Sequence, residues 1–252
     1  MANRSAWLGL LAGAYLAATI ALFPAQTAYH WFAAPGFDIA GIEGTIWRGR
    51  AAVAAVARLG VYDLEWSLRP LALITGRLTG QVQARLTDGF INTQLSVGLN
   101  SIRLSELQGL TSLSTLGRVV PLGDVQGLLS VQLAELVLED GWPVRAEGQL
   151  RIAQLATPLL MPGGPTDLVA LGDYLVNLNA GAAPGISGRF EDQGGPLEVA
   201  GTFTLSPSRA YDFTGLARAR PDAPEEIIQA LMFLPNASDG SNRRAFELGG
   251  TL

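Results

Sequence analysis

The side chains in this sequence that could do acid and base chemistry are three pairs of adjacent carboxylates. They are Glu139 with Asp140, Glu191 with Asp192, and Glu225 with Glu226. A glycosidase needs two carboxyl groups that face each other across the scissile bond. Two of the pairs lie at predicted turns and the third opens a predicted helix, where carboxylates serve for solvation and capping. We therefore interpret all three pairs as structural and keep an enzyme only as an alternative.

Other catalytic and metal-binding patterns do not occur in the sequence. The chain has no cysteine and one histidine, which excludes a disulfide framework, thiolate catalysis and a Cys/His metal cluster. A Walker loop, a dinucleotide-binding fingerprint and a nucleophile elbow are also absent. The histidine, His30, stands in an aromatic cluster at 29–32 with no carboxylate nearby, so we interpret it as an interface residue rather than a pH sensor. We expect no cofactor and no metal.

The composition describes an apolar and mildly acidic chain. Apolar residues make up 48% of the sequence, charged residues make up 15%, and the net charge is -5. All 17 basic residues are arginines, and they are scattered, which indicates a bias in base composition rather than a recognition patch. A nucleic-acid partner would require clustered positive charge, so the composition argues against one. The length of 252 residues allows one anchored domain or two small ones.

The N-terminal region predicts a membrane anchor. Residues 6–23 carry no charge and would form a helix about 27 Å long, which is just enough to cross a bilayer. Arg4 precedes this segment and the next charge is Asp38, so the positive-inside rule places residues 1–5 in the cytoplasm and the rest of the chain outside it. The aromatic cluster at 29–32 suits a membrane interface. Residues 24–43, with a break at Pro35-Gly36, are then a linker.

A cleaved signal peptide is the alternative interpretation of the same segment. Cleavage after Ala25 would put bulky Phe23 where a small residue is needed, and cleavage after Ala28 would put Gln26 there. We therefore favour a retained anchor that crosses the membrane once.

The stretch 44–80 is the most distinctive part of the sequence and predicts two short strands joined as a hairpin. Trp47 and Trp66 mark the strands, and Arg69-Pro70 ends the second. Gly76 and Gly80 then bracket a further turn before the next strand.

Two motifs in this stretch resemble a known family. Gly-Thr-Ile-Trp-x-Gly at 44–49 and Leu-x-Trp-x-Leu-Arg-Pro-Leu at 64–71 resemble protein N of the bacterial type II secretion system. Gly-Gly-Pro-Leu at 194–197, Gly201, Leu205, Tyr211 and the terminal Gly-Thr-Leu at 250–252 resemble the closing repeats of that family, which are also similar to those of AsmA-like periplasmic proteins. The structural motif positions in this chain are Gly44, Trp47, Gly49, Trp66, Arg69, Pro70, Gly76, Gly195, Pro196, Gly201 and Tyr211.

Residues 81–155 read as antiparallel strands with one interruption. Val82, Ala84 and Leu86 alternate with polar residues, and Asp88-Gly89 signals a hairpin into the next strand. Ser105 could cap a short helix through leucines at 107, 110, 113 and 116 that stops at Gly117, and a polar loop is the alternative. Strand patterns return on both sides of a turn at 140–141.

The last third repeats this organisation after a loop at 156–166, which is a possible subdomain boundary. Strands are predicted near 173–181, 185–192, 196–207 and 209–221, and a last strand at 243–252. Asp222 and Glu225 have capping-box spacing before a short apolar helix that Pro235 ends, and this helix is expected to cover an end or an open face of the sheet.

The predicted fold is therefore mainly β: an N-terminal transmembrane helix followed at 44–252 by an extended, curved antiparallel sheet, either an open meander or a partial barrel, with a few short helices. The resemblance implies a non-enzymatic component of the type II secretion apparatus, anchored in the inner membrane with its β domain in the periplasm. Its partners would be other proteins of that apparatus. The alternative is a lipid-handling periplasmic protein of AsmA-like type, with a phospholipid held on the apolar face of the sheet.

Overall fold

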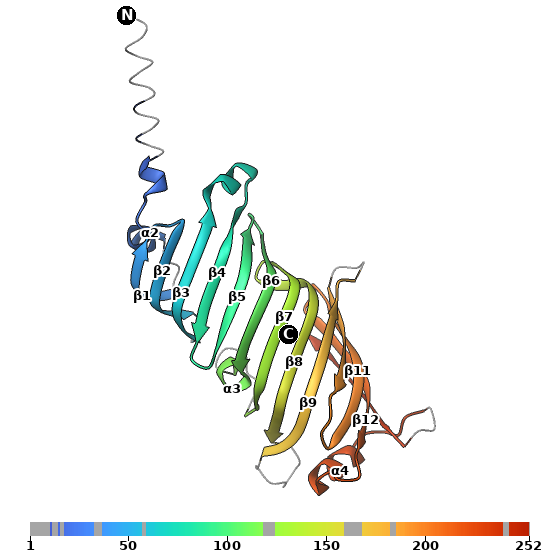
Figure 1. The fold of residues 1–252 in the computed structure, drawn as a ribbon. Helices are drawn as coiled ribbons and strands as arrows, with labels where there is room; N and C mark the ends of the chain where they lie inside the picture. The colour runs from blue at the N-terminus through green and yellow to red at the C-terminus, as the bar shows by residue number, and fades with distance from the viewer. Residues whose placement is uncertain are drawn as a thin grey trace, which may run out of the picture.

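The structure is a computed structural model that describes residues 11, 15, 18–32, 37–56, 59–117, 124–158, 168–181, 185–238 and 242–251. Within these residues, one antiparallel sheet of thirteen strands forms the body of the protein, and its strands follow one another in chain order. Figure 1 shows the sheet as a long, twisted and curved ribbon. Strands β1 and β13 are its two edges, so the sheet is open. The prediction of a mainly β, antiparallel meander with few helices is confirmed.

The strand bounds are β1 (Phe37–Gly44), β2 (Arg48–Val56), β3 (Leu59–Arg69), β4 (Leu78–Leu86), β5 (Gly89–Val97), β6 (Ser101–Ser112), β7 (Gln126–Glu139), β8 (Trp142–Pro158), β9 (Leu168–Asn179), β10 (Ile186–Asp192), β11 (Leu197–Leu205), β12 (Ala210–Ala219) and β13 (Arg244–Thr251). Short helical segments interrupt or flank the described strands: α2 (Ala25–Phe32), the 3-10 helix η1 (Pro70–Thr75), α3 (Leu113–Leu116) and α4 (Glu225–Met232).

Most of the predicted anchor at 6–23 lies outside the described residues. Leu11, Tyr15 and residues 18–21 are helical and exposed. None of the helices in the described part of the chain has the length and apolar character needed to cross a membrane. The segment predicted as a linker, 24–43, holds helix α2 and most of strand β1.

The predicted helix from Ser105 to Gly117 is wrong for most of its length. Residues up to Ser112 belong to β6, which pairs with β5 on one side and with β7 on the other. Only the short α3 is helical, and its cap is the Ser112 hydroxyl, which accepts a hydrogen bond from the backbone of Thr115 at 3.2 Å. Leu107 and Leu110 have helical spacing, but in β6 they lie on opposite faces of the strand, and Leu110 is 37% exposed. Strand β6 also has a bulge at Glu106, where φ is +51°, just before these two leucines.

Each of three such bulges is held by a polar contact to the neighbouring strand. Asp63 in β3 pairs with Arg85 at 3.2 Å, and Glu106 in β6 accepts a hydrogen bond from the Gln94 side chain at 2.7 Å. The third bulge, at Gln154 in β8, donates its backbone N–H to Asp173 at 2.8 Å. All three bulged residues have positive φ, so these contacts offset part of the backbone strain.

The helix near the C-terminus is confirmed, but its predicted capping box is not. Helix α4 begins after Pro224, with no side-chain cap, and the first turn forms instead through the Pro224 carbonyl, which accepts from Ile227 at 3.1 Å. Ile227 is 2% exposed, and Leu231 packs against the apolar cluster of Tyr174, Val199 and Ala217. The helix therefore covers one end of the apolar face, as expected.

The proposed boundary at 156–166 lies mostly outside the described residues. Strands β8 and β9 flank it and pair with each other up to Pro158 and Leu168. The same sheet thus continues on both sides of this loop.

Candidate interaction surfaces

The register of the sheet gives it one apolar face that crosses ten strands without a break. Directly paired residues from β4 to β13 form a single row on this face: Ala84, Ile91, Gly109, Val131, Leu150, Val176, Phe190, Gly201, Gly215 and Phe246. Most described side chains on this face are half-buried rather than buried. No described side chain of large volume is fully enclosed. Among the described residues, the apolar face is therefore not covered by a complete second layer of structure.

Glycines on the apolar face are covered by aromatic rings from the paired strand. Trp66 lies over its partner Gly49, so that a Cβ on Gly49 would meet the ring at 2.5 Å. Phe190 covers Gly201, Phe203 covers Gly188, Phe246 covers Gly215 and Tyr211 covers Gly250 in the same way. An absent side chain thus makes room for a ring that would otherwise stand upright on the sheet. This accounts for four of the motif positions: Gly49, Trp66, Gly201 and Tyr211.

These pairs bring aromatic rings from distant strands together near the C-terminus. Phe190 in β10 and Phe246 in β13 lean over the glycines between them, and their ring centroids are 6.2 Å apart. Phe213 stacks on Phe203 at 5.3 Å and meets Tyr211 edge-on at 6.1 Å. Such contacts stabilise the sheet by about 0.5–1.5 kcal/mol each beyond the burial of area.

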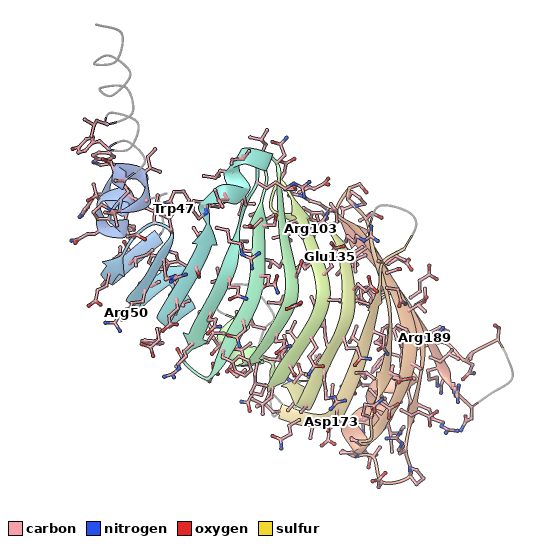
Figure 2. The ribbon with its side chains drawn as sticks, turned by 45° about the horizontal axis from the view of Figure 1, so that its top comes forward. Trp47, Arg50, Arg103, Glu135, Asp173 and Arg189 are labelled. Atoms are coloured by element: carbon pink, nitrogen blue, oxygen red, sulfur yellow. The ribbon has the colours of Figure 1, made fainter. Side chains whose placement is uncertain are left out.

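The opposite face carries a polar row that crosses all thirteen described strands. One residue from each strand pairs directly with the next: Glu43, Arg50, Glu65, Gln83, Asn92, Gln108, Gln132, Gln149, Asn177, Arg189, Thr202, Thr214 and Glu247. Six neighbouring members are amides, and ten of the thirteen side chains are exposed. Figure 2 shows Arg50 toward one end of the sheet and Arg189 toward the other.

Ion pairs on this polar face are mostly exposed. Arg50 and Glu43 pair at 2.6 Å with both side chains more than half exposed. Glu135 in β7 lies between Arg103 at 3.1 Å and Arg145 at 3.4 Å, near the middle of the sheet (Figure 2). Exposed pairs of this kind contribute about 0–1 kcal/mol each. The face is therefore hydrated and evenly polar, with no concentrated charge.

A buried carboxylate closes the turn between β10 and β11. Asp192, whose side chain is 8% exposed, accepts hydrogen bonds from Arg220 at 2.5 Å, from the Val199 backbone at 3.0 Å and from the Gly194 backbone at 3.3 Å. Burial acts to raise the pKa of Asp192, but the hydrogen bonds from Val199, Arg220 and Gly194 outweigh it and hold the pKa below its ordinary value.

The Gly-Gly-Pro motif takes its shape from this same contact. Arg220 also donates to the Gly195 carbonyl at 2.5 Å, and its backbone N–H donates to the Pro196 carbonyl at 2.8 Å. Gly194 and Gly195 both have positive φ, which glycine adopts without strain. A Cβ on Gly195 would also approach the Leu171 carbonyl at 2.7 Å. The motif therefore forms a tight turn between β10 and β11 rather than a ligand-binding loop.

The hydroxyl of Tyr174 lies in the same buried region. It donates a hydrogen bond to the Leu171 carbonyl at 3.1 Å. Burial, together with the negative charge of Asp192, raises the pKa of Tyr174 to about 12. The phenol thus stays neutral and serves as a hydrogen-bond donor.

The N-terminal motif joins the entering chain to the sheet. The Trp47 indole donates to the Ile20 carbonyl at 2.7 Å, and the Trp66 indole donates to the Ile46 carbonyl at 3.1 Å. Gly44, at φ +92°, leaves no room for a Cβ against the Arg48 carbonyl. Arg69 then ends β3, Pro70 begins η1, and Gly76 ends η1 in the left-handed region. These motif residues shape turns and junctions.

The three acidic pairs do not form a common site. Glu139 and Asp140 lie at the β7–β8 turn, Asp192 is tied to Arg220, and Glu225 with Glu226 begins α4. No cluster of His, Asp and Glu suited to a metal ion occurs within the described ranges. The interpretation of these carboxylates as turn and helix residues agrees with their positions.

Sequence reasoning missed one structural carboxylate. Asp88 at the β4–β5 turn accepts hydrogen bonds from Thr115 at 3.1 Å and from Thr111 at 3.5 Å, and so ties α3 to the hairpin. Burial acts to raise the pKa of Asp88, but hydrogen bonds, first those from Ser112 and Thr115, hold it below its ordinary value. The two threonines are the polar residues in the buried set. Nothing local in the sequence links Asp88 to residues so much further along the chain.

Comparisons with known proteins show the family to which the chain belongs. Residues 35–246 match the family model of the type II secretion system (T2SS), protein N. This chain belongs to that family. It is also similar to the type II secretion system protein N of Vibrio cholerae serotype O1, with 27% identity over 265 residues that cover 99% of this chain and all of that protein. No solved structure matches. The resemblance seen in the motifs is thus confirmed along the whole chain, and a family member is a component of the secretion system.

Proposed function

We propose that this protein is a non-enzymatic, membrane-anchored component of the type II secretion apparatus, with the sheet in the periplasm as a support for assembly of the export complex. The family match over 35–246 carries this proposal. The uncharged segment at 6–23, with Arg4 before it, supports an anchor whose N-terminus lies in the cytoplasm. The carboxylates of Asp192 and Asp88 are tied to structural donors, which supports a binding role rather than catalysis.

The sheet edges offer the means of binding partner proteins. At β1, helix α2 packs alongside and the Tyr29 hydroxyl accepts a hydrogen bond from the Ile39 backbone at 3.2 Å. At β13, only the first part is bridged, through contacts of residues 235–237 with Arg243, Arg244 and Ala245. Beyond these contacts, β13 pairs with β12 alone among the described strands. The remainder of β13 is therefore the edge at which a strand from another secretion protein would be added.

Deleting the coding sequence and measuring exported proteins in the medium tests this role. We expect folded cargo to accumulate in the periplasm, and a copy of the gene supplied in trans to restore export. A proline at Glu247 in β13, whose backbone N–H points away from β12 as that of Ala245 does, is expected to weaken the complex while the purified protein stays folded. Unchanged export and unchanged assembly in the deletion strain would contradict the proposal.

A second candidate function is the handling of lipid. The specific observation in its favour is the unbroken apolar row from Ala84 to Phe246, with mostly half-buried neighbours, because such a face suits acyl chains. Native mass spectrometry of the protein after mild extraction tests it. A bound phospholipid would favour this function, whereas lipid-free protein with normal stability would count against it.

A further inference from the structure

The turn between β3 and β4 presents three apolar side chains to solvent. Leu71 is 78% exposed, Leu73 is 49% exposed and Ile74 is 84% exposed. The turn is well formed rather than frayed, because Pro70 starts η1 and the Gly76 backbone donates to the Leu73 carbonyl at 2.9 Å. Leu99, in the adjacent turn between β5 and β6, is 99% exposed. We call these four side chains the apolar tip.

The apolar tip lies at the end of the sheet where the N-terminal segment enters. A chain of hydrogen bonds connects the two: the Trp47 indole donates to the Ile20 carbonyl at 2.7 Å, and the Leu68 backbone donates to the Trp47 carbonyl at 2.6 Å, two residues before η1. Pairing of Leu78 with Val97 places the turn that holds Leu99 at the same end. Figure 1 shows the coil between β3 and β4 at the top of the sheet, toward the side on which α2 lies.

Two cations flank the apolar side chains of η1. Arg69 precedes the turn and Arg77 follows it, and both are exposed. Neither guanidinium pairs with a carboxylate of the described chain. Apolar side chains at the centre with free cations at the rim are the arrangement of a peptide that inserts into a lipid headgroup region.

From these observations we infer that the apolar tip inserts into the surface of the bilayer that holds the N-terminal segment, with Arg69 and Arg77 against anionic headgroups. This inference rests on the proposed anchor. The tip provides a second point of contact beside the helix, and two contacts fix the direction in which the sheet leaves the membrane. The tip therefore adds to the hold of the N-terminal junction and sets the position of the polar and apolar faces relative to the bilayer.

The absence of native cysteine makes a direct test possible. Single variants Ile74→Cys and Met232→Cys are labelled with an environment-sensitive fluorophore in the full-length protein. Met232, which is 65% exposed on α4, is the matched control. Vesicles of phosphatidylethanolamine and phosphatidylglycerol, with and without a nitroxide-labelled phospholipid, are the probe. We expect the label at 74 to shift its emission to the blue and to be quenched by the nitroxide, and the label at 232 to do neither.

The outcomes separate the two proposals. Vesicle-bound protein whose label at 74 stays in water overturns the inference and leaves the anchor intact. A blue shift without nitroxide quenching also overturns it, because the tip would then contact protein rather than lipid. Protein that fails to float with vesicles overturns the anchor and the inference together. An Ile74→Asp variant, which is expected to keep the melting temperature because the side chain is exposed, should lose the quenching of a label placed at Leu71→Cys.

Discussion

Trp66 in β3 lies directly across from Gly49 in β2, and its ring occupies the space where a side chain on Gly49 would stand. The same relationship recurs among neighbouring strands from β10 to β13. Paired glycine and aromatic residues therefore shape the apolar face at both ends of the sheet. Because the space is already filled, substitution at these glycines is expected to disturb packing rather than only the backbone.

Gly49→Ala is expected to destabilise the protein by about 1–3 kcal/mol, the usual cost of overpacking. The new Cβ would meet the Trp66 ring at 2.5 Å and the Glu43 carbonyl at 2.7 Å. Gly60→Ala is the control, since the nearest atom there is the Tyr62 hydroxyl at 3.4 Å. Urea unfolding of the two variants measures the difference, and equal stabilities would contradict the packing account.

Asp192→Ala is expected to cost about 2–3 kcal/mol, because it leaves Arg220 and the Val199 amide without their acceptor. Arg220 is 32% exposed, so water compensates part of the loss. The control is Glu43→Ala, which breaks an exposed pair worth about 0–1 kcal/mol. If both variants melt at the same temperature, the buried contact contributes no more than a surface one.

Acid is expected to destabilise the fold through Asp192 and Asp88. Both have a pKa below the ordinary 3.8 in the folded protein, so their stabilising contribution is complete above that value and is lost as the pH falls through the folded pKa. The free energy of unfolding should therefore begin to fall near pH 4 and continue to fall below it. The Asp192→Asn variant, measured at the same pH values, should show a shallower decline, and an unchanged slope would argue against this assignment.

The raised pKa of Tyr174 predicts that the folded protein loses stability at alkaline pH. Its pKa is raised from 10.0 to about 12 in the folded protein, so the unfolded chain ionises first as the pH rises. Stability should be unaffected below pH 10 and should decline between pH 10 and 12. Tyr174→Phe is expected to cost about 1 kcal/mol at neutral pH through the lost bond to Leu171, and to remove this part of the decline. Ultraviolet absorbance of the phenolate follows the titration directly.

The sequence was sufficient for the fold class and for the family because their signals are local. Alternation in Val82, Ala84 and Leu86, and turn residues at Asp88-Gly89 and Asp140-Gly141, each report on a few neighbouring residues. A sheet whose strands pair in chain order can be predicted from little more than these local signals. The motifs at 44–49 and 64–71 could also be recognised in the sequence, because glycine, proline and tryptophan mark positions where only those residues fit.

Only the tertiary structure decided which residues stand side by side. Leu107 and Leu110 have the spacing of a helix but lie on opposite faces of β6, and no local pattern reveals that this segment pairs with β5 and β7. The link between Asp88 and Thr115, the contact of Asp192 with Arg220, and the polar row from Glu43 to Glu247 likewise depend on register. Register is set by hydrogen bonds between neighbouring strands, and a shift of one residue exchanges the two faces of a strand. The sequence of one strand alone therefore does not predict which of its residues lie beside those of the next strand.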